Sequence, residues 1–254
     1  MVRKALAGGV AAVLWTLALA AQTSSAPVPA LLEKAREAFA HRSSVPQARA
    51  AVRLFAEAAA ADASSYEARW EGARACYYLG TWAEPEMGEK EKLALFEDGI
   101  ARAKAAVALK PEGAEGHFWL GVLYGVFGET KGIFKSLSLV PEIQREMEAC
   151  LRLDRAVEGY GPDRLLGRLY FKLPGFKGGD NRKSIAHLKA AVEGEPRHPL
   201  SRLYLAETLK AEGEKDAARA QLRALLQMDP DPRWSAEYPA IRAQGEALLR
   251  KLGG

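Results

Sequence analysis

The feature that most constrains the fold of this chain is a pattern of apolar and small residues that occurs twice between residues 161 and 230. Each copy has a leucine, a small residue, a large apolar residue three positions later, a further apolar or small pair and a closing proline. The members are Leu166, Gly167, Tyr170, Ala190, Ala191 and Pro196, and then Leu205, Ala206, Leu209, Leu225, Leu226 and Pro230. A small residue lets two helices approach closely, apolar residues fill the seam, and proline ends a helix because it has no N–H to donate. The pattern therefore predicts two consecutive pairs of antiparallel helices.

The same pattern, more loosely spaced, extends over most of the chain and resembles the tetratricopeptide repeat (TPR) signature. The composition favours helices, since Ala, Leu, Glu, Lys and Arg are abundant and runs of Val, Ile and Thr are absent. We expect an all-α fold, a TPR-like α-solenoid of antiparallel helix pairs that forms a single domain over residues 31–254. An opening helix pair is expected first. The repeat-like units and the closing helix are then predicted at residues 66–111, 114–155, 160–196, 199–230 and 239–252.

The N-terminus has the three parts of a secretory signal peptide over residues 1–20. Two basic residues precede an apolar run at 5–17, and Ala18-Leu19-Ala20 is a small-x-small cleavage pattern. A membrane anchor is the alternative, but the apolar run is shorter than the ~20 residues that span a bilayer. We therefore predict an exported protein, periplasmic or secreted, with a flexible lead at 21–30 before the first helix.

The charge of the chain argues against nucleic acid as a partner. The formal charge is +4 at neutral pH, and it falls to 4 − 2 = +2 if Arg3 and Lys4 leave with the signal peptide. The remaining charges alternate in sign along the predicted helices and form no basic block. After cleavage no membrane span is expected, and no cysteine directly follows the cleavage site to carry a lipid.

Two inserts interrupt the regular units. Residues 129–141 are more apolar than a solvated loop, which favours a short helix folded back on the core, or else an exposed contact for a partner or a second subunit. Residues 173–180 are rich in glycine but contain no phosphate-binding GxxxxGK[ST] motif. Asp180 is expected to be the N-cap of the helix that follows. A pore or an interface between copies is a further alternative for both inserts.

One stretch, residues 160–180, has a more specific resemblance. It consists of Tyr160-Gly161-Pro162-Asp163-Arg164-Leu165-Leu166-Gly167-Arg168-Leu169-Tyr170, then Leu173-Pro174-Gly175 and Gly178-Gly179-Asp180. This run resembles the TPR-like T-component family of TRAP transporter systems, in which a leucine-glycine helix leads to a proline and a Gly-Gly-Asp before the next helix. The resemblance implies a periplasmic helical protein that cooperates with a solute-binding protein for organic acids and can form homo-oligomers. Members of that family usually carry a lipid anchor on a cysteine that this chain lacks.

Stacked TPR units expose one face of each first helix on a concave surface, and helical spacing predicts which residues lie there. The candidate groove residues are Trp70, Arg74, Tyr77, Tyr78, Phe118, Arg164, Arg168, Phe171 and Lys172, with Val122, Leu203, Glu207 and Lys210 on the same predicted face. Aromatic rings beside arginines suit a ligand with an apolar body and a carboxylate, or the acidic end of a peptide, because guanidinium pairs with carboxylate at two points. The alternative is that the rings belong to the core and the cations only solvate the groove.

No motif in the chain predicts catalysis, a cofactor or a metal site. The four histidines lack a ligand spacing such as HExxH, and GxSxG is absent. Cys76 and Cys150 fall on helices that are not expected to be neighbours, so we predict buried free thiols rather than a disulfide. The sequence therefore predicts a non-enzymatic binding scaffold. It is either an accessory to periplasmic organic acid uptake, with a solute-binding protein as partner, or a general protein interaction scaffold in envelope assembly.

Overall fold

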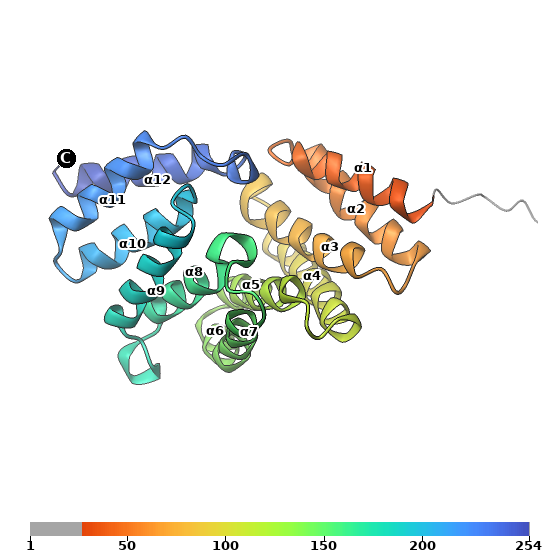
Figure 1. The fold of residues 1–254 in the computed structure, drawn as a ribbon, viewed down its shortest axis with the longest axis horizontal. Coiled ribbons are helices and arrows are strands. Elements are labelled where there is room, and N and C mark those ends of the chain that lie inside the picture. The colour runs from red at the N-terminus through yellow and green to blue at the C-terminus, as the bar shows by residue number, and fades with distance from the viewer. Residues whose placement is uncertain (1–26, 254) are drawn as a thin grey trace, which may run out of the picture.

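The structure is a computed structural model that describes residues 27–253, and every regular element within this range is a helix. The predicted signal peptide at 1–20 lies outside the described residues. In chain order the helices are α1 (Val28–Ala40), α2 (Val45–Ala61), α3 (Tyr66–Tyr78), the π-helix η1 (Leu79–Ala83), α4 (Glu89–Leu109), α5 (Ala114–Lys131), α6 (Ile133–Ser138), α7 (Val140–Leu153), α8 (Val157–Lys172), the 3-10 helix η2 (Gly175–Lys177), α9 (Asn181–Gly194), α10 (Pro199–Ala211), α11 (Lys215–Gln227), the 3-10 helix η3 (Pro232–Trp234) and α12 (Tyr238–Lys251). Consecutive long helices pack in pairs along a curved path (Figure 1), so the predicted all-α TPR-like solenoid is confirmed.

The seam between α8 and α9 shows why the repeat pattern folds in this way. Leu166 on α8 is buried, and the backbone of Gly167 approaches α9 so closely that a Cβ atom there would lie 2.5 Å from Cγ of Leu188. Leu188 is itself fully buried. The small residue of the pattern is thus the point at which two helices touch, as the sequence predicted.

The first helix begins earlier than predicted. α1 starts at Val28, inside the stretch 21–30 that we expected to be a flexible lead. Pro29 lies in the first turn, where its missing N–H leaves no helical hydrogen bond unmade. The prediction of a lead was therefore wrong for residues 28–30, because the proline there starts a helix and does not prevent one.

Both predicted inserts contain short helices. In the first, α5 continues to Lys131 and α6 packs against α5, which matches the expected short helix. Ile133 and Phe134 on α6 are nevertheless 61% and 89% exposed. In the second, η2 precedes Asp180, whose carboxylate accepts hydrogen bonds from two backbone N–H groups at the start of α9. The predicted N-cap is therefore confirmed.

The buried side chains form two large clusters that divide the solenoid into halves. The N-terminal half, α1 to α8, is built around aromatic and small residues, whereas the C-terminal half, α9 to α12, is built mainly around leucines. Trp82, in the π-helix η1, packs against both clusters although it belongs to the N-terminal half. The two halves therefore meet at η1 as well as along the α8–α9 seam.

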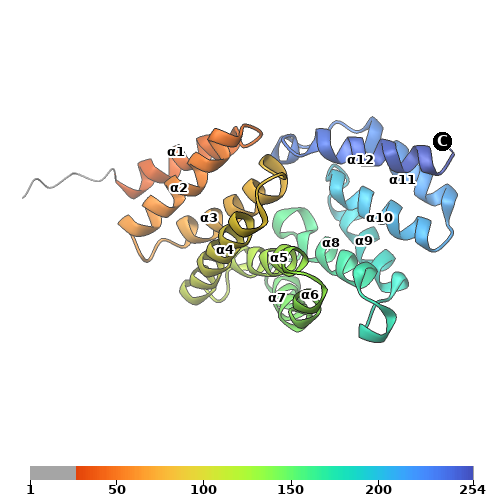
Figure 2. The ribbon, with the colours of Figure 1, turned by 180° about the vertical axis from the view of Figure 1, so that it is seen from behind.

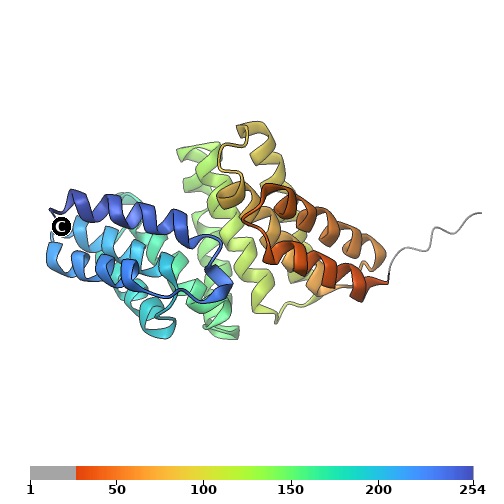
Figure 3. The ribbon, with the colours of Figure 1, turned by 90° about the horizontal axis from the view of Figure 1, so that it is seen from above.

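The two ends of the solenoid also meet, so the helices enclose a ring. Figures 1 and 2 show from opposite sides that the segment before α12 reaches the loop between α1 and α2, and Figure 3 shows the same approach from above. Arg42 in that loop bonds Glu237 through Nε–Oε1 at 2.7 Å and Nη2–Oε2 at 3.1 Å, and it also donates to the backbone carbonyls of Phe39 and Arg233. Arg42 and Glu237 are both buried. We call this the ring-closing contact.

Candidate functional site

A cavity of about 190 Å³ lies inside the ring, between the two halves. Its wall is formed by α3 and η1, α5, α8, α10, and the segment from η3 into α12. The aromatic residues on this wall are Tyr77, Tyr78, Trp82, Phe118, Trp119, Tyr204 and Trp234, and the ionisable ones are Glu129, Glu158, Arg164, Arg168, Lys172, His198 and Glu237. The cavity thus combines flat apolar surfaces with a small set of charges, which is typical of small-molecule sites.

Part of the wall is a left-handed backbone turn at the start of α8. Glu158, Gly159 and Tyr160 have φ values of 49°, 62° and 56°, and the right-handed part of the helix follows them. A left-handed residue with a side chain costs about 1–3 kcal/mol and is common at functional sites. Gly159 is required for a second reason, because a Cβ atom there would lie 2.7 Å from the ring of Trp234. Pro162 is accommodated because it falls in the first right-handed turn.

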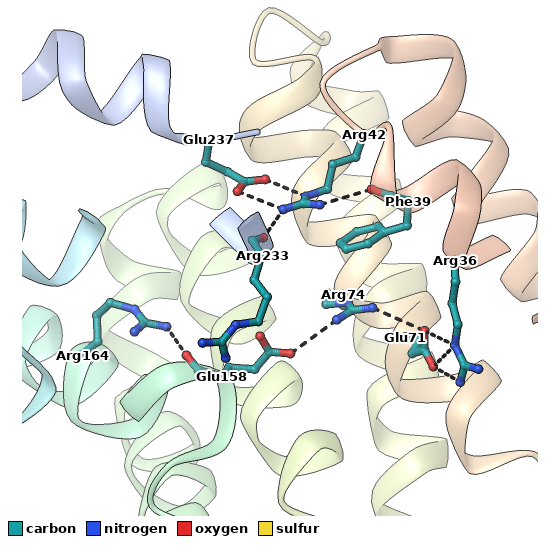
Figure 4. Close-up of polar contacts among 9 residues, drawn as sticks. All are labelled: Arg36, Phe39, Arg42, Glu71, Arg74, Glu158, Arg164, Arg233 and Glu237. Atoms are coloured by element: carbon teal, nitrogen blue, oxygen red, sulfur yellow. Dashed lines mark hydrogen bonds and ion pairs between the residues drawn. The ribbon is translucent and has the colours of Figure 1, made fainter. Parts of the chain in front are cut away.

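Arg164 holds this turn in place (Figure 4). Its Nη1 donates to the carbonyl of Gly159 at 2.9 Å, its Nη2 donates to the carbonyl of Glu158 at 3.0 Å, and Ser201 Oγ lies 3.5 Å from Nη1. No described carboxylate forms an ion pair with Arg164, and burial lowers the pKa of its guanidinium. A guanidinium has five N–H groups, so at least two remain for a ligand. A buried cation without an opposite charge is costly, and a bound anion would relieve that cost.

The carboxylates around Arg164 already have cations of their own. Glu158 lies 3.7 Å from Arg74, which also pairs with Glu71 at 3.4 Å, and Glu71 accepts two hydrogen bonds from Nε of Arg36 at 2.9 and 3.0 Å (Figure 4). Glu237 is engaged in the ring-closing contact. Burial raises the pKa of Glu237 and its bonded guanidinium opposes that rise. At this end of the cavity, the described charges are therefore matched except for that of Arg164.

The basic face of α8 continues one and two turns further along the helix. Arg168 pairs with Glu207, and its guanidinium carbon lies 4.2 Å from the centroid of the Tyr204 ring. The charge of Arg168 is thus already partnered by protein groups. Lys172, at the C-terminal end of α8, shares the cavity wall with Glu129, a residue of opposite charge. The two ends of the cavity therefore differ, with an unmatched cation at one and a cation and an anion at the other.

Two buried polar atoms in residues of the wall have no hydrogen-bond partner in the described part of the chain. They are Nε1 of Trp119 and Nδ1 of His198, and the residues are only 3% and 4% exposed. The rings of His198 and Trp234 have centroids 4.1 Å apart. Burial, together with the nearby charges of Arg164 and Arg233, lowers the pKa of His198 well below its usual range, so the imidazole is neutral. Buried polar atoms without partners are uncommon, and they are a reason to look for a bound group.

The structure places most of the predicted groove residues on the cavity wall. They are Tyr77, Tyr78, Phe118, Arg164, Arg168 and Lys172, together with Val122. Arg74 and Trp70 lie off the wall, where the Arg74 guanidinium packs over the rings of Phe39 and Trp70 at 4.3 and 4.9 Å. Phe171 also lies off the wall, near Arg168. Leu203 is 1% exposed and belongs to the core of the C-terminal half, so for this residue the alternative of a core position applies.

Some of the wall residues that the sequence analysis missed, such as Trp119 in α5 and Tyr204 in α10, lie within regular helices. Others come from irregular segments or from the segment that closes the ring. Trp82 lies in the π-helix, Glu158 in the left-handed turn, and Trp234 and Glu237 in the segment that closes the ring. Helical periodicity identifies a face only within a regular helix. The available signal was the presence of tryptophans outside the repeat pattern, since a surface loop seldom needs so large an apolar side chain.

The sequence predicts no metal site and two buried free thiols. Within residues 27–253, no group of three or more His, Cys, Asp or Glu side chains is arranged to hold a metal ion. Cys76 and Cys150 are buried free thiols, as predicted. Over the same range, no helix combines the length and apolar character that crossing a membrane requires.

Fold and cavity together define a class, that of TPR-like helical scaffolds with an internal cavity. Two family profiles match the sequence. Regulator of microtubule dynamics protein 1-3 matches residues 31–173, which is more than half of the chain, and a tetratricopeptide repeat family matches residues 176–244. The chain therefore belongs to the regulator of microtubule dynamics protein 1-3 family. Neither profile is that of the TRAP T-component.

Comparison with solved structures supports the fold. A thermophilic TPR protein from Thermus thermophilus is similar with a TM-score of 0.64 and 20% sequence identity, over 88% of this chain and 99% of that one. At this identity the likeness concerns the fold alone. No sequence among the curated proteins matches the chain. The binding partner must therefore be inferred from the cavity and from the surface of this chain.

Proposed function

We propose that this protein is a non-enzymatic TPR scaffold that holds a small organic anion in the cavity inside its ring. The observation that carries the proposal is Arg164, a buried guanidinium on the cavity wall that has backbone and hydroxyl partners but no described carboxylate partner. Charge-assisted hydrogen bonds from such a group to a carboxylate are about twice as strong as hydrogen bonds between neutral groups. The aromatic residues of the wall provide apolar surface for the body of the ligand.

We further propose that the protein is exported and assists periplasmic organic acid uptake in the manner of a TRAP T-component. The signal peptide pattern at residues 1–20 and the run at 160–180 support this proposal. Gly161, Arg164 and Arg168, within that run, are residues of the cavity wall. In this proposal a solute-binding protein is the partner that exchanges the anion with the cavity.

A protein interaction scaffold is the second candidate function. The TPR profile favours protein binding, and the family to which the chain belongs is named for regulation of microtubule dynamics. Ile133 and Phe134 on α6 give the chain an exposed apolar contact outside the cavity. The partner in this second candidate is either a protein of envelope assembly or a second copy of this chain.

Calorimetric titration of the purified protein with a panel of organic acids tests the first candidate. Arg164→Gln should abolish the binding of any acid that binds the wild type. Arg197→Gln is the control. Arg197 also donates to backbone carbonyls, at 3.1 and 3.3 Å, but it is half-exposed, pairs with Asp229 and is not part of the cavity wall. Absence of binding for the whole panel at millimolar concentration, or binding that Arg164→Gln leaves unchanged, would overturn the assignment.

Capture from a periplasmic extract of the host after mild crosslinking separates the two candidates. Enrichment of a solute-binding protein supports the uptake role. Enrichment of assembly proteins, or of a cytoskeletal protein in an extract of whole cells, supports the interaction scaffold. Replacing Phe134 by Ser should weaken capture in the second case and leave it unchanged in the first.

A further inference from the structure

The volume of the cavity limits the size of its ligand. The cavity measures about 190 Å³. An apolar protein cavity of about 150 Å³ is known to hold benzene. The remaining volume is enough for a short link and a carboxylate, but not for a second ring inside the cavity. The part of a ligand that lies inside therefore has a body about the size of one aromatic ring or one branched chain.

The charges on the wall limit the number of negative charges on the ligand. Arg164 offers one unmatched positive charge, and Arg168 is already paired with Glu207. Three carboxylates, Glu129, Glu158 and Glu237, also belong to the wall. Glu237 is bonded by Arg42 and Glu158 lies 3.7 Å from Arg74, so both of these carboxylates are held in place by fixed cationic partners. Lys172, the further cation of the wall, lies eight residues beyond Arg164 on α8, about 12 Å along the helix. A second negative charge on a ligand of this size would therefore face carboxylates without reaching another free cation.

The shape of the wall favours a flat body over a flexible polar one. Phe118 and Trp119 are in edge contact, with ring centroids 5.0 Å apart, and Tyr77 lies 5.5 Å from Trp119. Rings arranged in this way leave faces and edges that a further ring can contact in the same geometry. A peptide backbone would instead need several hydrogen-bond partners. The contact between Arg42 and Glu237 also joins the two ends of the solenoid, so its concave face is not an open groove along its whole length.

We infer that the cavity binds a monocarboxylate with a single aromatic ring or a branched aliphatic body of similar size, with its carboxylate on Arg164. This inference rests on the proposed function, since it names the chemical class of the anion that the cavity holds. It also sets a selectivity, because dicarboxylates and acidic peptides are excluded by the wall carboxylates and by the closed ring.

The inference is tested on the purified full chain with a reference compound and three probes, each of which differs from the reference in one property. Phenylacetate is the reference, phenylacetamide lacks the charge, phenylmalonate has a second carboxylate on the same body, and biphenylacetate has a second ring. Binding is measured by calorimetry and by the fluorescence of the tryptophans of the wall, Trp82, Trp119 and Trp234. Phenylacetate should bind, and each of the other three should bind at least about tenfold more weakly, as expected for the loss of one charge-assisted contact.

A variant pair ties the selectivity to the named residue. Arg164→Gln should remove the preference for phenylacetate over phenylacetamide, whereas Arg197→Gln should keep it. Because Arg164 also holds the left-handed turn, the variant could fail to fold, and the comparison of acid with amide on the wild type then remains a complete test.

The outcomes separate this inference from the proposed function. Tighter binding of phenylmalonate, biphenylacetate or an acidic peptide than of phenylacetate, with dependence on Arg164, overturns the inference and leaves anion binding standing. Equal binding of acid and amide overturns both, and so does the absence of binding by any organic anion.

Discussion

The N-terminal and C-terminal halves of this solenoid differ in how uniform their helix lengths and cores are. Helices α9 to α12 have 13 or 14 residues each and share a leucine-rich core. Helices α1 to α8 range from 6 to 21 residues, include the insert α6, and surround a core of aromatic and small residues. The repeat profile matches the regular half, at 176–244, whereas the family profile matches the irregular one, at 31–173. The regular helices thus lie where the general repeat profile matches, and the irregular ones lie where the profile of the particular family matches.

The irregular segments of the N-terminal half and of the junction supply much of the candidate site. The cavity lies between the halves, and its distinctive wall residues come from departures from the repeat, namely Trp82 in a π-helix, Glu158 in a left-handed turn and Trp234 in a 3-10 helix. In a repeat protein each unit normally contacts only its neighbours, so stability is a sum of local terms. The ring-closing contact adds a long-range term to that sum. The contrast between the halves therefore predicts which changes act locally and which act on the junction.

The largest expected effect is on the junction. Arg42→Ala leaves the Glu237 carboxylate buried without its cation, which should lower the free energy of unfolding by about 3–5 kcal/mol. Urea unfolding followed by circular dichroism measures the change. Arg49→Ala is the control, because Arg49 also pairs with two carboxylates, Glu84 and Glu91, but in an exposed position, and it should have little effect. Equal small changes in the two variants would show that the ring closure contributes nothing to stability.

A second prediction compares two glycines, one at the seam between the halves and one in the cavity wall. Gly167→Leu should overpack the seam against Leu188 and lower stability by about 1–3 kcal/mol. Gly125, within α5, has open space where a Cβ atom would lie, with no neighbouring atom within 4 Å, so Gly125→Ala should raise stability by about 0.5–1 kcal/mol through helix propensity. Thermal melts of both variants measure the two changes. A Gly167→Leu variant that is no less stable than the wild type would show that the seam is not where the structure places it, and a destabilised Gly125→Ala would show that the space beside Gly125 is not open.

The regular half was accessible from the sequence because each of its signals is local. The leucines and small residues of 160–230 recur at helical spacing, and Asp180 stands where a cap must stand, so units and cap could be predicted. The ring closure could not, since nothing local relates Arg42 to Glu237 across 195 positions. The groove face was predicted where helices are regular, as for Arg164 and Arg168. Trp70, Arg74 and Phe171 lie off the cavity wall although they belong to regular helices, and a role for them in binding stays a prediction.

A third prediction concerns a polar joint across the seam and its dependence on pH. Asp163 on α8 is fully buried and accepts from Nε of Arg155 at 2.7 Å and bonds Nδ1 of His187, on α9, at 2.8 Å. Burial raises the pKa of the Asp163 carboxyl, but the hydrogen bonds from His187 and Arg155 together lower it by more, so that the pKa lies below its usual value. The ionised carboxylate therefore stabilises the fold above its unfolded pKa, and this contribution is lost as the pH falls through the folded pKa.

The measurement is the melting temperature of the wild type and of Asp163→Asn as a function of pH. The difference between them should be full near neutral pH and should shrink once the pH falls below about 4, where the carboxylate of the unfolded chain is protonated. A difference that stays constant down to strongly acidic pH would show that folding does not shift the pKa of the Asp163 carboxyl, which would contradict the charged joint.

The smallest expected effect concerns the order in which the two halves unfold, which the thiols report because both cysteines lie in the N-terminal half. Burial raises the pKa of the Cys76 and Cys150 thiols to about 12, so in the folded protein they are neutral as well as shielded and should not react with a disulfide reagent at mildly alkaline pH. Their reactivity in rising urea then reports the opening of the N-terminal half alone, while circular dichroism reports both halves. If the C-terminal half unfolds separately, helical signal is lost before the thiols react, and Arg42→Ala should widen that interval. Coincident transitions in both proteins would instead show that the α8–α9 seam alone couples the halves into one cooperative unit, whatever the ring closure does.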